Sequence, residues 1–285
     1  MFDPAMLEYM TGRAQMEQAL RIAVRRQEIV PYYQPLLNLV DGKLIGFEAL
    51  ARWQRENGEF TPPDVFIALA EDAGVITELS ESLLRQACTE AQNWPNDTIL
   101  AFNISPTQLT DRLLGLRIVQ ILAETGLSPH RLEIEIIESA LVRDTETAIM
   151  IVADLHNAGI RVALDDFGTG FSSLSQLGTL SFDKIKIDRS FISDSEHDVK
   201  RRKIVNAIVN LGRGLGIETT AEGIETLEQY ALMKEMGCSS GQGYLFSKAR
   251  PASEVQALIA SLLAINLVPP ETDVVRKLEK IALIV

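Results

Sequence analysis

The sequence predicts an α/β protein whose strands close into a single (β/α)8 barrel with one antiparallel strand. Runs of β-forming residues alternate with segments of helical periodicity, which is typical of a mostly parallel sheet. Eight such runs fit within 285 residues, a length that suits one α/β barrel. No G-x-G-x-x-G motif follows a strand, which disfavours an open dinucleotide-binding sheet.

The predicted strands are short runs rich in apolar residues. The first two, 32–39 and 43–50, are joined at Asp41-Gly42, a hairpin signal, so one of them should run antiparallel to the rest. The other six are 99–105, 131–137, 161–165, 182–188, 217–222 and 239–246.

The predicted helices lie between these strands. Ala148, Ile151, Val152 and Leu155 have the spacing of one apolar helix face, in a segment that follows Asp144 as N-cap. The other expected helices are about 13–29, 62–71, 75–93, 111–125, 204–215, 224–236 and 252–264.

Composition excludes several classes of protein. Hydrophobic residues make up 46% of the chain, enough for a large core, which excludes disorder as the main state. No apolar run approaches the roughly 20 residues of a membrane span, and the N-terminus lacks the pattern of a secretory signal. Two cysteines exclude a disulfide framework, and a net charge of −12 argues against binding long nucleic acid. We therefore expect a cytoplasmic protein without membrane contact.

Polar side chains recur at the carboxyl ends of the predicted strands. In a barrel these ends open onto one mouth, so residues far apart in the sequence should converge there. The residues concerned are Glu48, Asn103, Glu135, Asp165, Asp166, Lys186, Asp188, Glu222 and Gln242.

This set has the chemistry of a metal site. Five adjacent carboxylates would repel strongly unless cations neutralised them, and oxygen ligands without Cys or His select Mg²⁺ or Mn²⁺, with Ca²⁺ as an inert substitute. Asp165-Asp166 at one strand end could bridge two metals. Lys186 and Arg52 add positive charge suited to a phosphate or to orienting a water. A solvated loop residue or a helix cap would explain any one of these acids, but not the whole set.

At these positions the sequence closely resembles the EAL-domain family of cyclic di-GMP phosphodiesterases. The resemblance covers roughly residues 15–264 and follows the order of that family's motifs. Those motifs are YQP (33–35), EALARW (48–53), FNISP (102–106), DDFGTGFSSL (165–174), KIDRSF (186–191), AEGIET (221–226) and QGYLFS (242–247). The resemblance implies a modified TIM barrel with two Mg²⁺ or Mn²⁺ ions at its mouth. It also implies hydrolysis of cyclic di-GMP to linear pGpG, and that Ca²⁺ is inhibitory.

The resemblance also implies a role for each residue. The first metal would be held by Glu48, Asn103, Glu135 and Asp165, and the second by Asp165, Asp166 and Glu222. Lys186 would hold the attacking water and act in catalysis with Glu48 and Glu222. The substrate-binding residues would be Gln34, Leu50, Arg52, Asp188 and Gln242.

The segment that follows Asp165-Asp166 resembles the family's mobile sixth loop, which couples the active site to a dimer interface. Glu138 resembles the acid that anchors this loop, and the helix near 171–178 would lie at or near the interface of a homodimer. A plain glycine-rich turn is the alternative reading of this loop. Ile137, Phe171 and Ser239 depart from the usual family residues, and Ile137 could weaken the hydrogen bonding that positions the loop.

The ends of the chain suggest a larger context. FDPAM (2–6) resembles the segment that links a GGDEF domain to an EAL domain, so residues 1–14 are interpreted as a linker remnant after an upstream GGDEF or sensor domain. Residues 265–285 form a tail, expected as a short amphipathic helix. Two alternatives to an active phosphodiesterase remain open: a non-catalytic cyclic di-GMP receptor or interaction module, and a barrel metalloenzyme for another phosphorylated metabolite.

Overall fold

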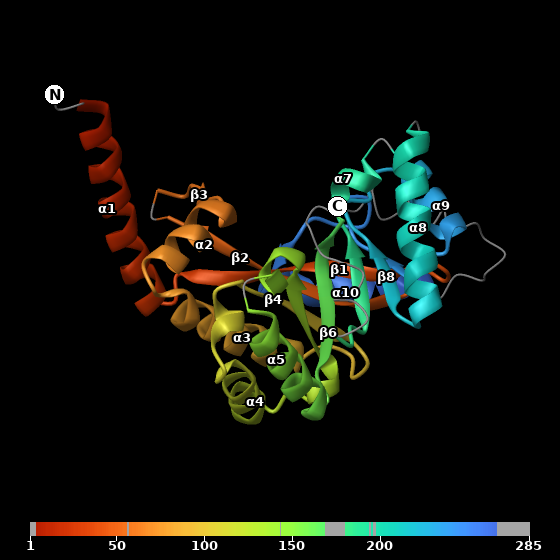
Figure 1. Ribbon diagram of the computed structural model, residues 1–285, viewed down its shortest axis with the longest axis horizontal. Helices are drawn as coiled ribbons and strands as arrows, with labels where there is room; N and C mark the ends of the chain where they lie inside the picture. The colour runs from red at the N-terminus through yellow and green to blue at the C-terminus, as the bar shows by residue number, and fades with distance from the viewer. Residues whose placement is uncertain are drawn as a thin grey trace.

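The computed structural model describes residues 4–55, 57–142, 144–168, 180–193, 195 and 198–266, and it confirms the barrel (Figure 1). The strands are β1 (Ile29–Asn38), β2 (Leu44–Gln54), β3 (Phe60–Thr61), β4 (Ile99–Ile104), β5 (Leu132–Ile137), β6 (Arg161–Phe167), β7 (Lys184–Ile187), β8 (Glu218–Ala221), β9 (Ser240–Gly241) and β10 (Arg250–Pro251). Strands β2 and β4 to β9 are parallel in that order. β1 pairs antiparallel with both β2 and β9 and so closes the barrel.

The predicted β1–β2 hairpin is confirmed. Gly42 has a φ of 73°, a value that glycine adopts without strain, and its N–H donates to the Asn38 carbonyl at 2.8 Å. The register places Gln34 opposite Glu48, so the turn brings two predicted site residues side by side.

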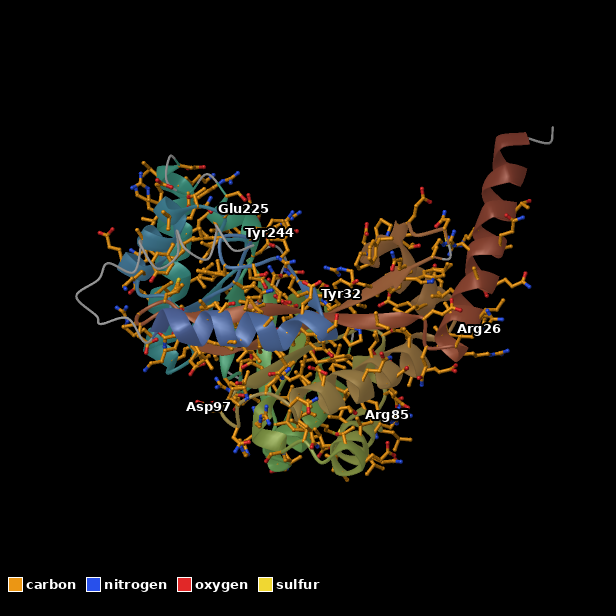
Figure 2. The ribbon with its side chains drawn as sticks, turned by 180° about the vertical axis from the view of Figure 1, so that it is seen from behind. Arg26, Tyr32, Arg85, Asp97, Glu225 and Tyr244 are labelled. Atoms are coloured by element: carbon orange, nitrogen blue, oxygen red, sulfur yellow. The ribbon has the colours of Figure 1, made fainter. Side chains whose placement is uncertain are left out.

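Helices cover the outside of the barrel. α3 (Ile76–Ala91), α4 (Leu114–Thr125) and α5 (Thr145–Asn157) lie along one flank, while α8 (Val199–Leu215) and α9 (Leu227–Met236) cover another (Figure 1). Seen from behind, α10 (Ala252–Asn266) crosses the barrel (Figure 2), where it contacts β1 and β2. The remaining helical segments are α1 (Pro4–Arg25), α2 (Pro63–Asp72), η1 (Gln108–Thr110), η2 (Pro129–Arg131), η3 (Glu138–Val142) and α7 (Arg189–Ile192).

Capping side chains decide where several helices begin. Asp144 accepts a hydrogen bond from the Thr147 N–H at 3.1 Å, as predicted. Asp198 caps α8, which therefore begins five residues before its apolar periodicity does. A capping box between Thr226 and Gln229 starts α9 at Leu227, three residues later than predicted.

The predicted strand at 239–246 is wrong beyond its first residues. β9 covers only Ser240–Gly241, after which the chain turns. The cause is a close approach of two backbones: a Cβ on Gly243 would lie 2.0 Å from the Ile224 carbonyl oxygen. Only glycine fits at position 243, because any side chain would collide with the Ile224 backbone. The strand therefore ends at Gly241, and Gln242 lies at the barrel mouth.

α1 begins at Pro4 and runs across the predicted boundary between linker and barrel at residues 14 and 15. Its second half packs on the body through buried Leu20, Ala23 and Val24, and Arg21 Nη2 donates to the Ala73 carbonyl at 2.8 Å. Its first half projects away from the barrel (Figures 1 and 2). Within the described part of the chain, no helix is long and apolar enough to cross a membrane. Most of the predicted C-terminal tail, residues 267–285, lies outside that part.

Candidate active site

Lys186 lies at the centre of the acidic mouth, in β7. Its Nζ lies 2.8 Å from Glu135 Oε2, 3.1 Å from Asp165 Oδ2 and 2.8 Å from Glu222 Oε1, with Glu48 Oε1 at 3.6 Å. The lysine side chain is 1% exposed. Burial disfavours its charge, but the surrounding carboxylates raise the pKa of Lys186 well above its ordinary value, so the group stays cationic.

Glu48 is held in one orientation by two amides. Asn103 Nδ2 donates to its Oε1 at 2.6 Å, and Gln242 Nε2 donates to its Oε2 at 2.5 Å. Gln242 Nε2 also lies 3.0 Å from Gln34 Oε1, and Gln34 Nε2 donates to the Ser247 carbonyl at 3.2 Å. Residues from β2, β4 and the segment after β9 therefore meet at the Glu48 carboxylate, and Gln34 from β1 supports it through Gln242.

The carboxylates form two groups that could each hold a cation. Glu48, Glu135 and Asp165 each offer one oxygen within 4.8 Å of the others, and so do Asp165, Asp166 and Glu222. Asp165 belongs to both groups. Among the residues that the structure describes, Glu135 Oε1 is buried without a hydrogen-bond partner, an unfavourable arrangement that a cation would relieve. All the donors are carboxylate or amide oxygens, which fits Mg²⁺ or Mn²⁺.

Burial, with repulsion between neighbouring carboxylates next, raises the pKa of several carboxyl groups in the cluster. Burial, with the charge of Glu48 next, raises the pKa of Glu135 well above its ordinary value. Burial raises the pKa of Glu222 to about 8 even though Lys186 opposes the shift, and burial with the charges of Asp165 and Asp188 raises that of Asp166 to about 6. At Glu48 burial also acts upward, but Lys186 and the amide of Gln242 outweigh it and lower the pKa. Without cations, the protein environment therefore favours protonation of Glu135, Glu222 and Asp166.

The backbone after β6 brings the two aspartates to the mouth. Asp166 has a φ of 56°, uncommon for a residue other than glycine, and its N–H donates to Asp165 Oδ1 at 2.8 Å. Two residues later, the Gly168 N–H donates to Glu138 Oε2 at 2.9 Å. This bond links β6 to η3 despite Ile137. Residues 169–179, which contain Phe171 and the predicted interface helix, lie outside the described residues.

The other predicted site residues surround this cluster. Arg52 lies on β2 with its guanidinium carbon 6.0 Å from the centre of the Tyr32 ring, and Leu50 lies two residues before it on the same strand. Asp188 follows β7 and caps α7 by accepting from the Ser190 N–H at 3.0 Å. Ser239 Oγ accepts from the Thr219 N–H at 3.3 Å, away from the carboxylates.

Sequence reasoning missed two groups of polar residues. Lys184 Nζ and Glu133 Oε1 lie 2.6 Å apart inside the barrel, one layer below Lys186 and Glu135. The alternation of LEIEII, which directs both glutamates to one face, was a readable signal for this pair. Glu71, on α2, is hydrogen-bonded to Ser105 beside the mouth. No local pattern in the sequence indicated that contact.

Comparisons with known proteins give a consistent result. The family model described as "EAL domain" matches residues 17–249. An uncharacterized protein of Sinorhizobium fredii, y4lL, is 44% identical over 261 residues, covering 91% of this chain and 31% of that protein. The bifunctional diguanylate cyclase/cyclic di-GMP phosphodiesterase MucR of Pseudomonas aeruginosa is 35% identical over 263 residues, covering 91% of this chain and 38% of that protein. The chain therefore spans about a third of the length of these relatives.

A solved structure supports the same assignment. The MucR phosphodiesterase in complex with c-di-GMP superposes with a TM-score of 0.81 at 36% identity, covering 85% of this chain and 99% of that one. The fold and the site define an α/β barrel with an acidic, lysine-centred mouth. The chain belongs to the EAL domain family.

Proposed function

We propose that this chain is a phosphodiesterase that hydrolyses cyclic di-GMP to pGpG with two divalent cations, Mg²⁺ or Mn²⁺. The supporting observation is the pair of carboxylate groups that share Asp165 around Lys186. Five carboxylates and one ammonium, if all ionised, leave four negative charges, which is the charge that two divalent cations would neutralise. The c-di-GMP named in the MucR complex supports the choice of substrate.

Each cation would have its own set of ligands. Glu48, Asn103, Glu135 and Asp165 would hold the first, and Asp165, Asp166 and Glu222 the second. When bound, the cations supply positive charge that acidifies a water and stabilises negative charge developing on phosphorus. Lys186 would orient the attacking water, a role that its retained charge and its short distances to both groups support.

The remaining residues would position the substrate. Arg52 would contact a phosphate, and Leu50 would contact a base. Gln34 and Gln242 would keep Glu48 in its binding orientation, as their hydrogen bonds suggest. Asp188, at the end of β7, would complete the substrate side of the mouth. A GGDEF or sensor domain would precede α1 and regulate this activity, a proposal supported by the longer relatives, of which the chain spans about a third.

A metal-depletion assay tests the proposal. Purified protein is incubated with cyclic di-GMP and the products are separated by chromatography. Excess EDTA should abolish hydrolysis, Mg²⁺ or Mn²⁺ should restore it with pGpG as product, and Ca²⁺ should bind without supporting turnover because its looser coordination misplaces the water. Full activity in EDTA would overturn the two-metal mechanism. Tight binding without turnover under every metal condition would instead identify a non-catalytic receptor.

A further inference from the structure

Two ion pairs are stacked inside the barrel on the same two strands. In the upper layer, which belongs to the candidate active site, Lys186 Nζ of β7 lies 2.8 Å from Glu135 Oε2 of β5. In the lower layer, Lys184 Nζ lies 2.6 Å from Glu133 Oε1, and the two side chains are 2% and 0% exposed. The partners are 51 positions apart in both layers, so the pairing of β5 with β7 repeats two residues further along each strand.

The repeat follows from the alternation of side chains along a β-strand. Residues two positions apart lie on the same face of a strand, separated by about 7 Å, so both glutamates of β5 and both lysines of β7 face the barrel interior. A one-residue slip of either strand would turn its charged side chains outward. The layers therefore lie close enough for the charge of one to act on the other.

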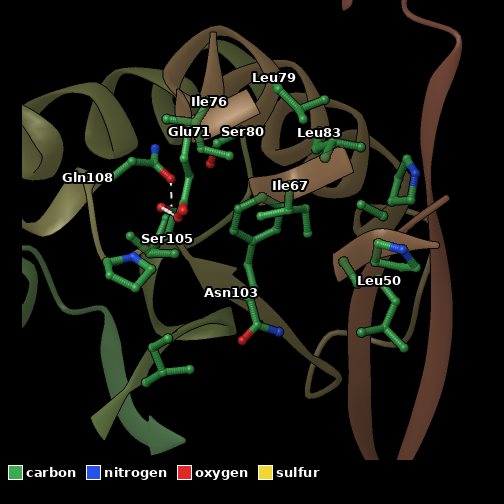
Figure 3. Close-up of a pocket in the computed structure, with 18 of the residues that line it drawn as sticks. Leu50, Ile67, Glu71, Ile76, Leu79, Ser80, Leu83, Asn103, Ser105 and Gln108 are labelled. Carbon is green, nitrogen blue, oxygen red and sulfur yellow. Dashed lines mark hydrogen bonds between the residues drawn. The ribbon is translucent and has the colours of Figure 1, made fainter. Parts of the chain in front are cut away.

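Small side chains on the neighbouring strands leave room for the lysines. Ala101 of β4 and Ala163 of β6 are buried at the positions two residues before Asn103 and Asp165. Barrels of this kind commonly fill such positions with bulky branched residues. Asn103, one step nearer the mouth, donates to Glu48 and also lines a pocket beside the carboxylates (Figure 3). Two charged pairs therefore occupy interior volume that apolar side chains would otherwise fill.

The two layers differ in charge. In the upper layer one ammonium faces four carboxylates, so negative charge is in excess. In the lower layer, Glu133 is the sole carboxylate in ion-pair contact with Lys184 among the described residues. Arg161 Nε lies 3.5 Å from the other oxygen of Glu133, and Arg161 Nη2 lies 2.6 Å from the exposed Glu218. Two cations therefore balance two carboxylates below, whereas the cluster above lacks positive charge.

A charge left without its partner in the lower layer would disturb the upper one, because little water screens buried charges. Without Lys184, the Glu133 carboxylate would attract the Lys186 ammonium away from the mouth. Without Glu133, the Lys184 ammonium would turn to Glu135 and compete with a cation for that carboxylate. Both changes would alter the group of charges that the proposed function requires.

We propose that Glu133 and Lys184 are positioning residues for the proposed reaction. By neutralising each other, they keep the Lys186 ammonium at the mouth and leave Glu135 available to the first cation. The inference rests on the proposed function and deepens it. Neither residue would touch the substrate or a cation, so their effect acts through the layer above. Removal of one partner should therefore disturb the site, whereas removal of both should restore the balance.

The test compares Glu133→Gln, Lys184→Met and the double variant Glu133→Leu with Lys184→Met. Mn²⁺ affinity is measured by calorimetry without substrate, and kcat and KM for cyclic di-GMP at saturating Mn²⁺, at a temperature at which circular dichroism shows each protein folded. Glu133→Gln should bind Mn²⁺ about ten-fold or more weakly, because Lys184 then occupies Glu135. Lys184→Met should bind Mn²⁺ at least as tightly as the wild type but lose about ten-fold or more in kcat, because Lys186 is displaced. The double variant should return to wild-type values of both.

The opposite effects of the two single variants on Mn²⁺ affinity distinguish positioning from a general loss of stability, which would weaken binding in both. Ile121→Ala is the matched control, because it truncates a buried side chain of α4 on the outside of the barrel. It should lower the melting temperature by a similar amount while leaving Mn²⁺ affinity and kcat unchanged.

The outcomes separate this inference from the proposed function. A wild type that binds Mn²⁺ but neither binds nor hydrolyses cyclic di-GMP would refute the proposed function, and the Mn²⁺ titrations would still test the lower layer. A wild type that hydrolyses cyclic di-GMP, with Glu133→Gln at wild-type Mn²⁺ affinity, would overturn the role of the lower layer alone. A folded double variant as impaired as the single ones would also overturn it, because the pair would then act by holding the strands together. If neither single variant folds, the double variant decides: wild-type Mn²⁺ affinity supports neutralisation, and weakened binding overturns it.

Discussion

Glu48 connects three parts of the site, since it meets Asn103, Gln242 and Lys186. Glu48→Ala should lower turnover of cyclic di-GMP by orders of magnitude while the barrel stays folded, because the change relieves repulsion within the acidic cluster. Arg52→Ala should mainly raise KM if its phosphate contact serves ground and transition states alike. Steady-state kinetics with a circular-dichroism melt distinguish the two. Near wild-type turnover in Glu48→Ala would contradict its assignment as a metal ligand.

The raised pKa values of Glu222 and Asp166 predict that metal affinity depends on pH. Their pKa values are raised to about 8 and about 6, so protons compete with cations for these oxygens at lower pH. Mg²⁺ or Mn²⁺ affinity should therefore rise as pH increases through 6 toward 8 and level off above. Calorimetric titrations across this window measure the trend, and Glu222→Gln should lose its upper part. An affinity that did not change with pH would refute the prediction.

The sequence predicted which residues form the site better than it predicted the side-chain contacts that those residues make. Glu48, Glu135, Asp165 and Glu222 were recognisable as acids at strand ends, a position that topology alone turns into proximity. The Ser105–Glu71 and Lys184–Glu133 contacts join residues 34 and 51 positions apart. The alternation of LEIEII indicates the face that Glu133 occupies, but the partner in each pair depends on how α2 and the strands pack, which no local pattern contains.

Strands β5 and β7 carry two layers of buried ion pairs. In the lower layer, Lys184 and Glu133 are 2% and 0% exposed, and Arg161 Nε lies 3.5 Å from the second oxygen of Glu133. Glu133→Gln leaves the buried Lys184 ammonium without its carboxylate partner and should destabilise the fold by about 3–5 kcal/mol. Replacing both residues, as Glu133→Leu with Lys184→Met, should recover most of that loss. Urea unfolding measures both values.

The exposed pair of Lys43 and Asp41, 3.0 Å apart, is the control for this experiment. Lys43→Met should change the free energy of unfolding by less than about 1 kcal/mol. A Glu133→Gln protein as stable as the wild type would show that the lower layer does not hold β5 and β7 together.

The loop after β6 is tied to η3 by the bond from Gly168 to Glu138. Because Asp165 and Asp166 directly precede this bond, Glu138→Ala should reduce Mg²⁺-supported turnover about ten-fold or more, and higher Mg²⁺ should recover part of the loss. If the loop also contacts a second copy, specific activity should fall on dilution below the dimer dissociation constant. An unchanged rate and metal dependence in Glu138→Ala, with activity independent of concentration, would favour a plain turn and a monomer.

Element type was easier to predict than element ends. Strands and helices alternate as the periodicity indicated, and the Asp41-Gly42 hairpin is present. The observed starts of α8 and α9 differ from the predicted ones because of their N-caps. Asp198 caps α8 before its apolar pattern begins, and Thr226 caps α9 after the predicted start. The predicted last strand is cut short by contact of Gly243 with Ile224, a residue in another βα unit.

The charge of the whole molecule limits its ligands. At a net charge of −12, long polyanions should be repelled outside the metal mouth. Single- or double-stranded DNA and RNA should neither bind nor compete at physiological salt, whereas pGpG should compete because it keeps both bases and the phosphates. Competition assays with labelled cyclic di-GMP measure this. Inhibition by a long oligonucleotide at micromolar concentration, with none by pGpG, would overturn both the charge argument and the substrate class.

Barrel closure by β1 has a consequence for biosynthesis. Gln34 bonds to residues 208 and 213 positions further along the chain, so the first strand must wait for almost the entire domain to leave the ribosome before its second edge is paired. Contacts of such long range form slowly, and until they form the acidic mouth has neither Glu222 nor Gln242. The order of translation therefore delays assembly of the complete acidic mouth until these last strands have left the ribosome, and a chain truncated before them would lack part of the candidate site.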